Sequence, residues 1–513
     1  MRDSEVILKQ PAHNLFNIGW TLGLLLAFLL GCGIFLRYSD LSAPLLDFHP
    51  TRQLFGAIKA RGIYYQSLLD APAWQKDLAV RQYAGEATIE PPLMEHLAAA
   101  FYQYFGEQTA IPRAVSASFW LLGGLFLFLL SKNLTDSLPA AAFGLAFYLL
   151  LPYAVTASRA FQPDPLMILL VLIFWWSIEN WGRRPSWRWT LISGISGGLA
   201  VFVKFPAAFF IIGAALGVIL GRVGLIKSIK LPQTWVIVLL GILPPGVYLY
   251  YGTYMNGFLG QQFGGRFYPE MWISPFFYLR WFLKLNIVAS VPWLALALLG
   301  CFVFSSKPVK IFLASLWIAY FVFGMTFAHH ISSHDYYSLP VIPIAALCLA
   351  QLAAGIQPLF EVAPVPGQAG RTPRFSGSIK FIIVSILLSS MLLISVDQYL
   401  KQRANDYRPE AAFWAQVGSA IGHQPGVLAL TTDYGYPLAY YGWQNSTPWP
   451  ASSDIQNFYE TFTRMASNKD YFLVTDFNEY ELQPELQKRL NENYPVLIQE
   501  RTFIVFDLAH PKK

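Results

Sequence analysis

The sequence has few charged residues for its length. Only 13% of its 513 residues are Asp, Glu, Lys or Arg, whereas 55% are hydrophobic, and the mean hydropathy is +0.41. A soluble chain of this size would carry about twice that charged fraction. The formal net charge of +6 is modest. It gives no reason to expect a nucleic-acid partner, because basic residues in a membrane protein usually mark cytoplasmic loops.

Cysteine is also scarce. Cys32, Cys301 and Cys348 each lie inside an apolar run. We therefore expect neither a disulfide nor a metal–thiolate site. Internal repeats are common in transporters, and the sequence contains no recognisable repeat.

Apolar runs of near-spanning length are abundant, and they predict a polytopic α-helical membrane protein with about eleven transmembrane helices. We place these spans near residues 17–36, 113–131, 138–157, 163–181, 189–205, 206–221, 232–251, 276–304, 309–328, 336–354 and 379–397. The stretch 189–221 is divided into two spans because it contains Lys204 and Pro206. A lysine is costly at mid-bilayer, and a proline disfavours an unbroken helix.

Loop charge predicts the orientation of these spans. Basic residues gather in the connections 183–188, 222–230, 307–310 and 371–380. With eleven spans and a cytoplasmic N-terminus, all four connections fall on the cytoplasmic side. The long loop 37–112, the loop 252–275 and the tail from residue 398 then lie outside.

The chain therefore divides into a transmembrane domain, 1–397, and a small extracytoplasmic α/β domain, 398–513. Strands are predicted at VLALTTD (427–433), YFLVTD (471–476) and within YPVLIQERTFIVFDL (494–508), with a helix at 408–421. The Pro/Gly/Ser-rich segment 363–378 is typical of a linker. An interfacial helix is expected at 92–105.

Polar residues gather at the predicted outer face of the bilayer. They are Asp47, His49, Arg52, Gln53, Glu90, Arg159, Asp164, Lys204, Arg266, His334, Asp335, Tyr336 and Tyr337. For Arg159, Lys204 and Asp335 taken singly, an interfacial anchor is the commoner explanation. The tyrosine pair fits an aromatic belt equally well.

Asp47 and Glu90 are less easily explained as anchors, because each lies beside a proline or a span end among apolar neighbours. A partly desolvated carboxylate at such a position could act as a general base or bind a divalent ion. Arg52, Arg159 or Lys204 could neutralise a phosphate leaving group. Asp47, His49 and Glu90 offer oxygen and nitrogen ligands for Mg²⁺, Mn²⁺ or Zn²⁺, although no tight spacing demands a metal.

Four segments carry a resemblance to a known family. They are DFHPTRQLFGAIKARG (47–62), IEPPLMEHLAAAFYQYFG (89–106), SRAFQPDPLMILL (158–170) and HDYYSLPVIP (334–343). In this arrangement the chain resembles the GT-C glycosyltransferases, in particular the dolichyl-phosphate-mannose protein mannosyltransferases and their bacterial relatives, the lipid A aminoarabinose transferases.

The resemblance implies an inverting glycosyltransferase in the plasma (inner) membrane. Its donor would be a polyprenyl-phosphate-linked monosaccharide, and its acceptor an extracytoplasmic protein, lipid or cell-wall glycan. Asp47 would be the general base, and Glu90 would lie near the acceptor or a metal. Arg159, Asp164 and Lys204 would belong to the donor-phosphate region. From its position alone, we expect the loop 252–275, with Arg266, to cover the donor.

The sequence departs from the family pattern at two points. Phe48 stands where relatives often have a second acid, with His49 next to it. No lysine neighbours the Glu-Pro-Pro element, which counts against lipid A as acceptor. Three alternatives stay open: a transporter or flippase of lipid-linked sugars, a GT-C enzyme that transfers a preassembled glycan, and a non-catalytic scaffold that displays the C-terminal domain.

Overall fold

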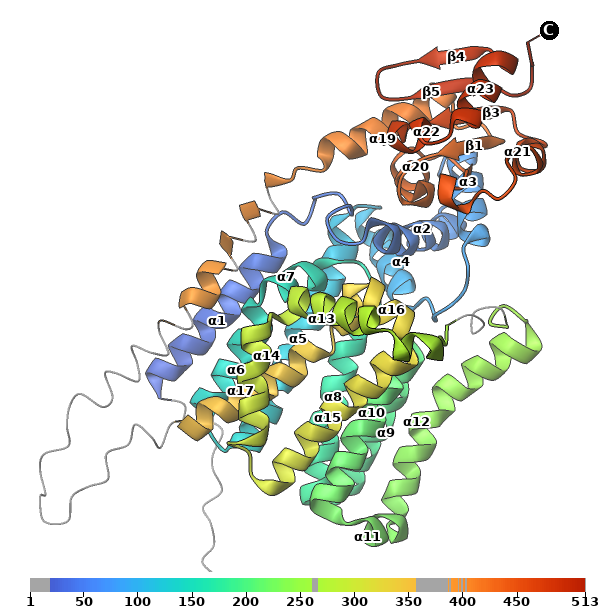
Figure 1. Ribbon diagram of the computed structural model, residues 1–513. Coiled ribbons are helices and arrows are strands. Elements are labelled where there is room, and N and C mark those ends of the chain that lie inside the picture. Colours follow the sequence, from blue (N-terminus) through green and yellow to red (C-terminus); the bar gives the residue numbers. More distant parts are fainter. Residues whose placement is uncertain are drawn as a thin grey trace, which may run out of the picture.

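The computed structural model describes residues 19–260, 266–356, 386, 389–394, 396–397, 400–401 and 404–512. A bundle of apolar helices carries a small α/β domain at one end, and the helices α2 to α4 lie between the two (Figure 1). We call this end of the bundle the domain-bearing face. The predicted linker 363–378 lies outside the described residues, as does most of the predicted span 379–397.

Most helices of the bundle coincide with predicted spans, and short helices such as Leu225–Lys230 lie between them. Their bounds are α1 Trp20–Tyr38, α5 Ala110–Thr135, α6 Leu138–Leu150, α7 Pro152–Arg159, α8 Asp164–Arg183, α9 Trp187–Val203, α10 Ala207–Val218, α11 Leu225–Lys230, α12 Pro232–Tyr250, α13 Pro275–Ala289, α14 Val291–Phe302, α15 Lys307–Thr326, α16 Ala328–Ser333 and α17 Val341–Ile356. Among described residues, six helices are long and apolar enough to cross a membrane, or eight if two bent pairs each count as one span. The chain is a multi-pass helical membrane protein, as predicted.

Proline and backbone geometry explain where the helices break. The predicted division of 189–221 is present, because Lys204 is extended and Pro206 precedes α10. The predicted span 138–157 is bent by 59° between α6 and α7, where Pro152 begins a new helix. The predicted span 276–304 is also a bent pair of helices. It turns by 87° between α13 and α14 at Ser290, whose φ is +50°.

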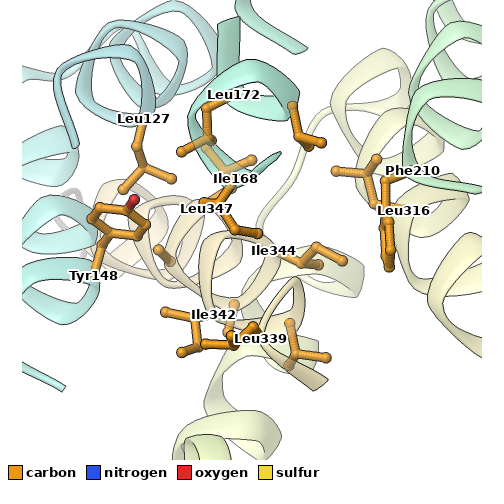
Figure 2. Close-up of a cluster of buried hydrophobic side chains, with 14 of the residues drawn as sticks. Leu127, Tyr148, Ile168, Leu172, Phe210, Leu316, Leu339, Ile342, Ile344 and Leu347 are labelled. Carbon is orange, nitrogen blue, oxygen red and sulfur yellow. The ribbon is translucent and has the colours of Figure 1, made fainter. Parts of the chain in front are cut away.

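The core of the bundle surrounds α17, which is buried along its length from Val341 to Leu352. Leu339, Ile342, Ile344 and Leu347 pack among side chains of the neighbouring helices (Figure 2). A helix that is apolar on every side is buried in a protein core or in a membrane, and α17 is enclosed by other helices of the bundle. The core therefore fixes α17, and with it the turn 335–338 at its N-terminal end.

Three helices cover the domain-bearing face. They are α2 Pro50–Ser67, α3 Ala73–Gly85 and α4 Leu93–Phe105. The last of these is the predicted interfacial helix. It begins after Pro92 and ends at Gly106, whose φ of +74° suits glycine.

The C-terminal domain contains a five-stranded sheet in the order β2-β1-β3-β5-β4. Strand β1 pairs in parallel with β2 and β3, whereas β5 is antiparallel to both of its neighbours, β3 and β4. Its strands are β1 Val427–Leu430, β2 Ser446–Pro448, β3 Tyr471–Val474, β4 Val496–Gln499 and β5 Ile504–Asp507, and its helices are α19 Arg408–Ile421, α20 Tyr436–Tyr441, α21 Phe458–Ala466, α22 Phe477–Glu481 and α23 Pro484–Asn493. The predicted helix 408–421 is present, and the last predicted run forms the β4–β5 pair. Strand β2 was not predicted, because SerThrPro carries almost no strand signal.

Candidate active site

A cavity of about 570 Å³ lies where α2, the segment 85–95, the turn 161–163 and the region 330–337 meet. This volume is typical of a small-molecule site. Six of the predicted site residues line it: Arg52, Glu90, Arg266, His334, Tyr336 and Tyr337. The structure does not place the other predicted residues among its lining.

Cations and imidazoles form one part of the lining. Arg52 lies over the ring of Tyr336, with its guanidinium 4.9 Å from the ring centre, and its Nη2 is 3.8 Å from the Glu90 carboxylate. His330 and His334 lie beside Arg266 in the same lining. Burial, together with the nearby Arg266 cation, lowers the pKa of His330 to about 4, and burial likewise lowers the pKa of His334. Both imidazoles are therefore neutral at pH 7.

Carboxylates form another part of the lining. Glu86, Glu90 and Glu95 come from one short segment and the start of α4. Burial raises the pKa of Glu95 to about 7, although Lys59 partly opposes this effect. Burial also raises the pKa of Glu86, against a hydrogen bond from the Tyr436 hydroxyl. Glu86 and Glu95 were not predicted as site residues. The one pattern in the sequence that points to them is that they lie near Glu90 along the chain.

Asp47 lies outside the lining of this cavity. Both of its carboxylate oxygens accept hydrogen bonds from Arg113, at 2.8 and 3.0 Å, and the side chains are 6% and 0% exposed. Burial opposes ionisation, but the Arg113 guanidinium holds the pKa of Asp47 below its usual range. Arg113 was not predicted as a site residue, although it begins the second predicted span.

Gln53 is a buried connector between three segments. Its Nε2 donates to the Phe48 carbonyl at 2.7 Å and to Asp47 at 3.2 Å, and its Oε1 accepts from the Phe161 N–H at 3.2 Å. These bonds join the start of α2 to the turn before α8. Gln53 thus positions the cavity wall, of which Phe161 is part.

His49 pairs with Asp335 across the domain-bearing face. Its Nε2 is 2.7 Å from an Asp335 carboxylate oxygen, and its φ of +45° is unusual for a residue other than glycine. The bond ties the start of α2 to the turn 335–338. Tyr336 in that turn contacts the His49 ring edge-to-face.

Lys204 and Asp164 form a second, separate group. The Lys204 ammonium donates to both Asp164 oxygens, at 2.8 and 3.0 Å, and both side chains are almost fully buried. Together with Tyr336 and Tyr337 they line a small hollow of about 10 Å³. The tyrosine pair therefore borders both the hollow and the large cavity.

Arg159 lies at the end of α7 and is buried. Its Nη2 donates to the Asp40 carbonyl at 2.9 Å, which holds the chain just after α1. Arg159 is not among the residues that line either hollow.

The three predicted metal ligands do not form a common ligand set. Asp47 is held by Arg113, His49 by Asp335, and Glu90 lies nearest Arg52. Within the described parts of the chain, no group of three or more His, Cys, Asp or Glu side chains is placed to hold a metal ion. This arrangement does not fit the predicted divalent ion, and no reaction step is assigned to one.

Comparison with known proteins agrees with the resemblance seen in the sequence. Residues 89–248 match a model of the dolichyl-phosphate-mannose-protein mannosyltransferase family. The fold is that of the GT-C glycosyltransferases. The comparison with curated protein sequences gave no match.

The solved structures that share this fold cover nearly the whole chain. ArnT from Cupriavidus metallidurans bound to undecaprenyl phosphate is 15% identical, with a TM-score of 0.59, over 96% of this chain and 99% of ArnT. The apo form of the same ArnT gives a TM-score of 0.60 at the same identity and coverage. The archaeal oligosaccharyltransferase AglB from Archaeoglobus fulgidus is 10% identical, with a TM-score of 0.55, over 94% of this chain and 74% of AglB. The likeness to these structures thus covers both the transmembrane bundle and the C-terminal domain.

Proposed function

We propose that this protein is an inverting glycosyltransferase that moves a monosaccharide from a polyprenyl-phosphate donor to an extracytoplasmic acceptor. The observation that carries the proposal is the single cavity in which Arg52 and Arg266 lie with Glu86, Glu90 and Glu95. Guanidinium groups bind phosphate, and a carboxylate can take a proton from an acceptor. The family match and the ArnT structure, which is bound to undecaprenyl phosphate, support this choice of donor.

The proposed step is a direct displacement. The acceptor oxygen or nitrogen attacks the anomeric carbon from the side opposite the phosphate, and a new glycosidic bond forms. The bond between the anomeric carbon and the phosphate oxygen breaks, and its electron pair stays on the phosphate. Arg52 and Arg266 neutralise that charge, while a carboxylate takes the acceptor's proton.

Two carboxylates are candidates for the general base. Asp47 is the base predicted from the sequence, but in the described conformation both of its oxygens are engaged by Arg113. Glu90 lines the cavity and is 25% exposed, and its ion pair with Arg52 is long, at 3.8 Å. We therefore assign the proton transfer to Glu90 and keep Asp47 as the rival in the test.

We place the domain-bearing face outside the cytoplasm of a plasma (inner) membrane. Lys227 and Lys230 lie in α11, at the opposite end of the bundle from the C-terminal domain (Figure 1). Basic loops favour the cytoplasmic side. The cavity would then meet a lipid-borne donor and an external protein, lipid or glycan acceptor at one surface.

The test uses the purified full-length protein in detergent with membrane extract as acceptor. Polyprenyl-phosphate monosaccharides are supplied one at a time, and release of polyprenyl phosphate is followed. Wild-type release from one donor, lost in folded Glu90→Gln, supports the transferase and its base. Loss in folded Asp47→Asn, with Glu90→Gln active, returns the base to Asp47.

Two further results would favour other functions. Because AglB shares the fold, the donor panel includes a lipid-linked oligosaccharide, and consumption of that donor alone would indicate transfer of a whole glycan. If no donor is consumed in detergent, but lipid-linked sugar crosses sealed proteoliposomes that contain the protein, the protein is a flippase.

A further inference from the structure

The C-terminal domain reaches into the cavity through one residue. Tyr436, the first residue of α20, is part of the cavity lining. Its hydroxyl donates to the Glu86 carboxylate at 3.0 Å, and its ring contacts Phe55 edge-to-face. Glu86 and Phe55 line the same cavity. One wall of the cavity thus belongs to a domain that begins some 300 residues later in the chain than the helices α2 to α4.

A buried arginine fastens this domain to α2. The Arg61 guanidinium lies 3.9 Å from the centre of the Tyr440 ring and 4.0 Å from that of Trp443, and it pairs with Glu107 at 2.8 Å. It also donates to the Tyr440 carbonyl at 2.8 Å. A cation desolvated between two aromatic rings is strongly held. The position of α20 against α2 is therefore well determined.

Two more hydrogen bonds reinforce the same contact. Gln82 donates to the Ala439 carbonyl at 2.9 Å, and the Leu45 N–H donates to the Tyr441 hydroxyl at 2.7 Å. Together with Arg61, they join α20 to α2, to α3 and to the loop before α2. These contacts hold α20 against α2 and so place Tyr436 in the cavity wall.

The turn before Tyr436 is unusual. Asp433, Tyr434 and Gly435 have consecutive positive φ values of +48°, +54° and +80°. For the two residues other than glycine, this conformation costs free energy and persists only where the surroundings hold it. The Thr51 hydroxyl donates to Asp433 at 3.3 Å, so the turn is anchored on α2 at the edge of the cavity. The turn directs Tyr436 at Glu86.

We propose that Tyr436 is the acceptor-side wall of the reaction cavity, and that it excludes water from the donor sugar while an acceptor is bound. This inference rests on the proposed function. In-line displacement places the acceptor on the side of the anomeric carbon opposite the phosphate, hence away from Arg52 and Arg266. Glu90 lies next to Arg52, at 3.8 Å, whereas Glu86 accepts a hydrogen bond from Tyr436, so we place the acceptor side of the cavity at Glu86 and Tyr436.

Water that enters the cavity can take the place of the acceptor and hydrolyse the donor. When water replaces the acceptor, its oxygen bonds to the anomeric carbon and a carboxylate of the lining takes its proton. The bond to phosphate breaks with its electron pair on the polyprenyl phosphate, and free sugar is released. A closed site suppresses such hydrolysis. Opening the wall should therefore raise hydrolysis relative to transfer without weakening the binding of polyprenyl phosphate, whose phosphate group contacts the cationic part of the lining.

The experiment compares Tyr436→Ala with Tyr434→Ala in the full-length protein. Tyr434 is 76% exposed, lies two residues away and does not line the cavity, so it is a matched control. Free sugar and sugar on acceptor are measured with the donor that the wild type consumes, together with the affinity for polyprenyl phosphate. We expect a severalfold rise in the ratio of hydrolysis to transfer for Tyr436→Ala alone, with unchanged affinity. Tyr436→Phe, which retains the ring, should keep the wild-type ratio.

Two results would overturn the inference while leaving the transferase intact. One is an unchanged ratio in a folded, active Tyr436→Ala. The other is a ratio in Tyr436→Phe equal to that of Tyr436→Ala, which would assign the effect to the hydroxyl and not to the ring as a wall. A wild type that consumes no donor would instead remove the proposed function, and this inference with it.

Discussion

Lys204 and Asp164 form an ion pair at the junction of α8, α9 and α10, with side chains 5% and 3% exposed. Breaking one side of a buried pair leaves an uncompensated charge and costs about 3–5 kcal/mol, whereas replacing both partners by apolar residues is often neutral. We expect Lys204→Met to lower the thermal unfolding midpoint in detergent strongly, and Lys204→Met/Asp164→Leu to recover most of the loss. If the double variant were no more stable than the single one, the pair would not be the cause.

Asp47 and Arg113 lead to a related prediction. Asp47→Asn leaves the fully buried Arg113 guanidinium without its carboxylate, so we expect a lower unfolding midpoint as well as lower turnover. Glu90 is 25% exposed and contacts Arg52 only at 3.8 Å, so Glu90→Gln should unfold close to the wild type. Unfolding midpoints and turnover are measured on the same samples. Equal midpoints for Asp47→Asn and the wild type would contradict a structural role for Asp47.

Arg52 should contribute to phosphate affinity. A hydrogen bond to a charged group contributes about 1.5–3 kcal/mol, so Arg52→Gln should weaken polyprenyl-phosphate binding by about tenfold or more. Arg81, which is exposed on α3 and outside the cavity lining, provides the control Arg81→Gln. Binding is measured by titration with polyprenyl phosphate in detergent. The same affinity in both variants would remove Arg52 from the phosphate site.

Glu95 should make stability depend on pH. Its pKa rises from 4.5 to about 7 in the folded protein because burial disfavours the charged form. The folded state then holds a proton that the unfolded chain has released, so the contribution of Glu95 is present below pH 4.5 and is lost as pH rises through about 7. Unfolding midpoints measured between about pH 5 and 8 should fall with pH in the wild type and fall less in Glu95→Gln. Parallel curves for the two proteins would show that Glu95 does not titrate in this range.

Arg61 should control the docking of the C-terminal domain. Arg61→Ala removes the contacts with Tyr440, Trp443 and Glu107, and we expect faster amide hydrogen exchange in residues 436–443. Arg61→Lys should be only a partial replacement, because an ammonium lacks the planar stack. Arg501→Ala, at an exposed position of the same domain, is the control. Unchanged exchange in Arg61→Ala would show that other contacts suffice for docking.

The class of protein and the positions of most helices could be predicted from the sequence. Apolar runs located the helices of the bundle, because a helix that crosses a membrane needs a run of about 20 mainly apolar residues, and such a run can be recognised in the sequence. Lys204 and Pro206 correctly divided 189–221, since each acts locally on the backbone or on the cost of insertion. The carboxylate at Glu90 and the cation at Arg52 also followed from local pattern, and both line the cavity.

The contacts between polar residues could not be predicted from the sequence and became visible in the folded chain. It paired Asp47 with Arg113 and His49 with Asp335, and it added Glu86, Glu95 and Tyr436 to the cavity. These partners are separated by tens to hundreds of residues, so no local period or spacing encodes their contact. The bend of 87° at Ser290 was also not predicted, because hydropathy gives the length of an apolar run and not the direction of the helix axis. Contact across the fold depends on how the helices pack, and that is a property of the whole chain.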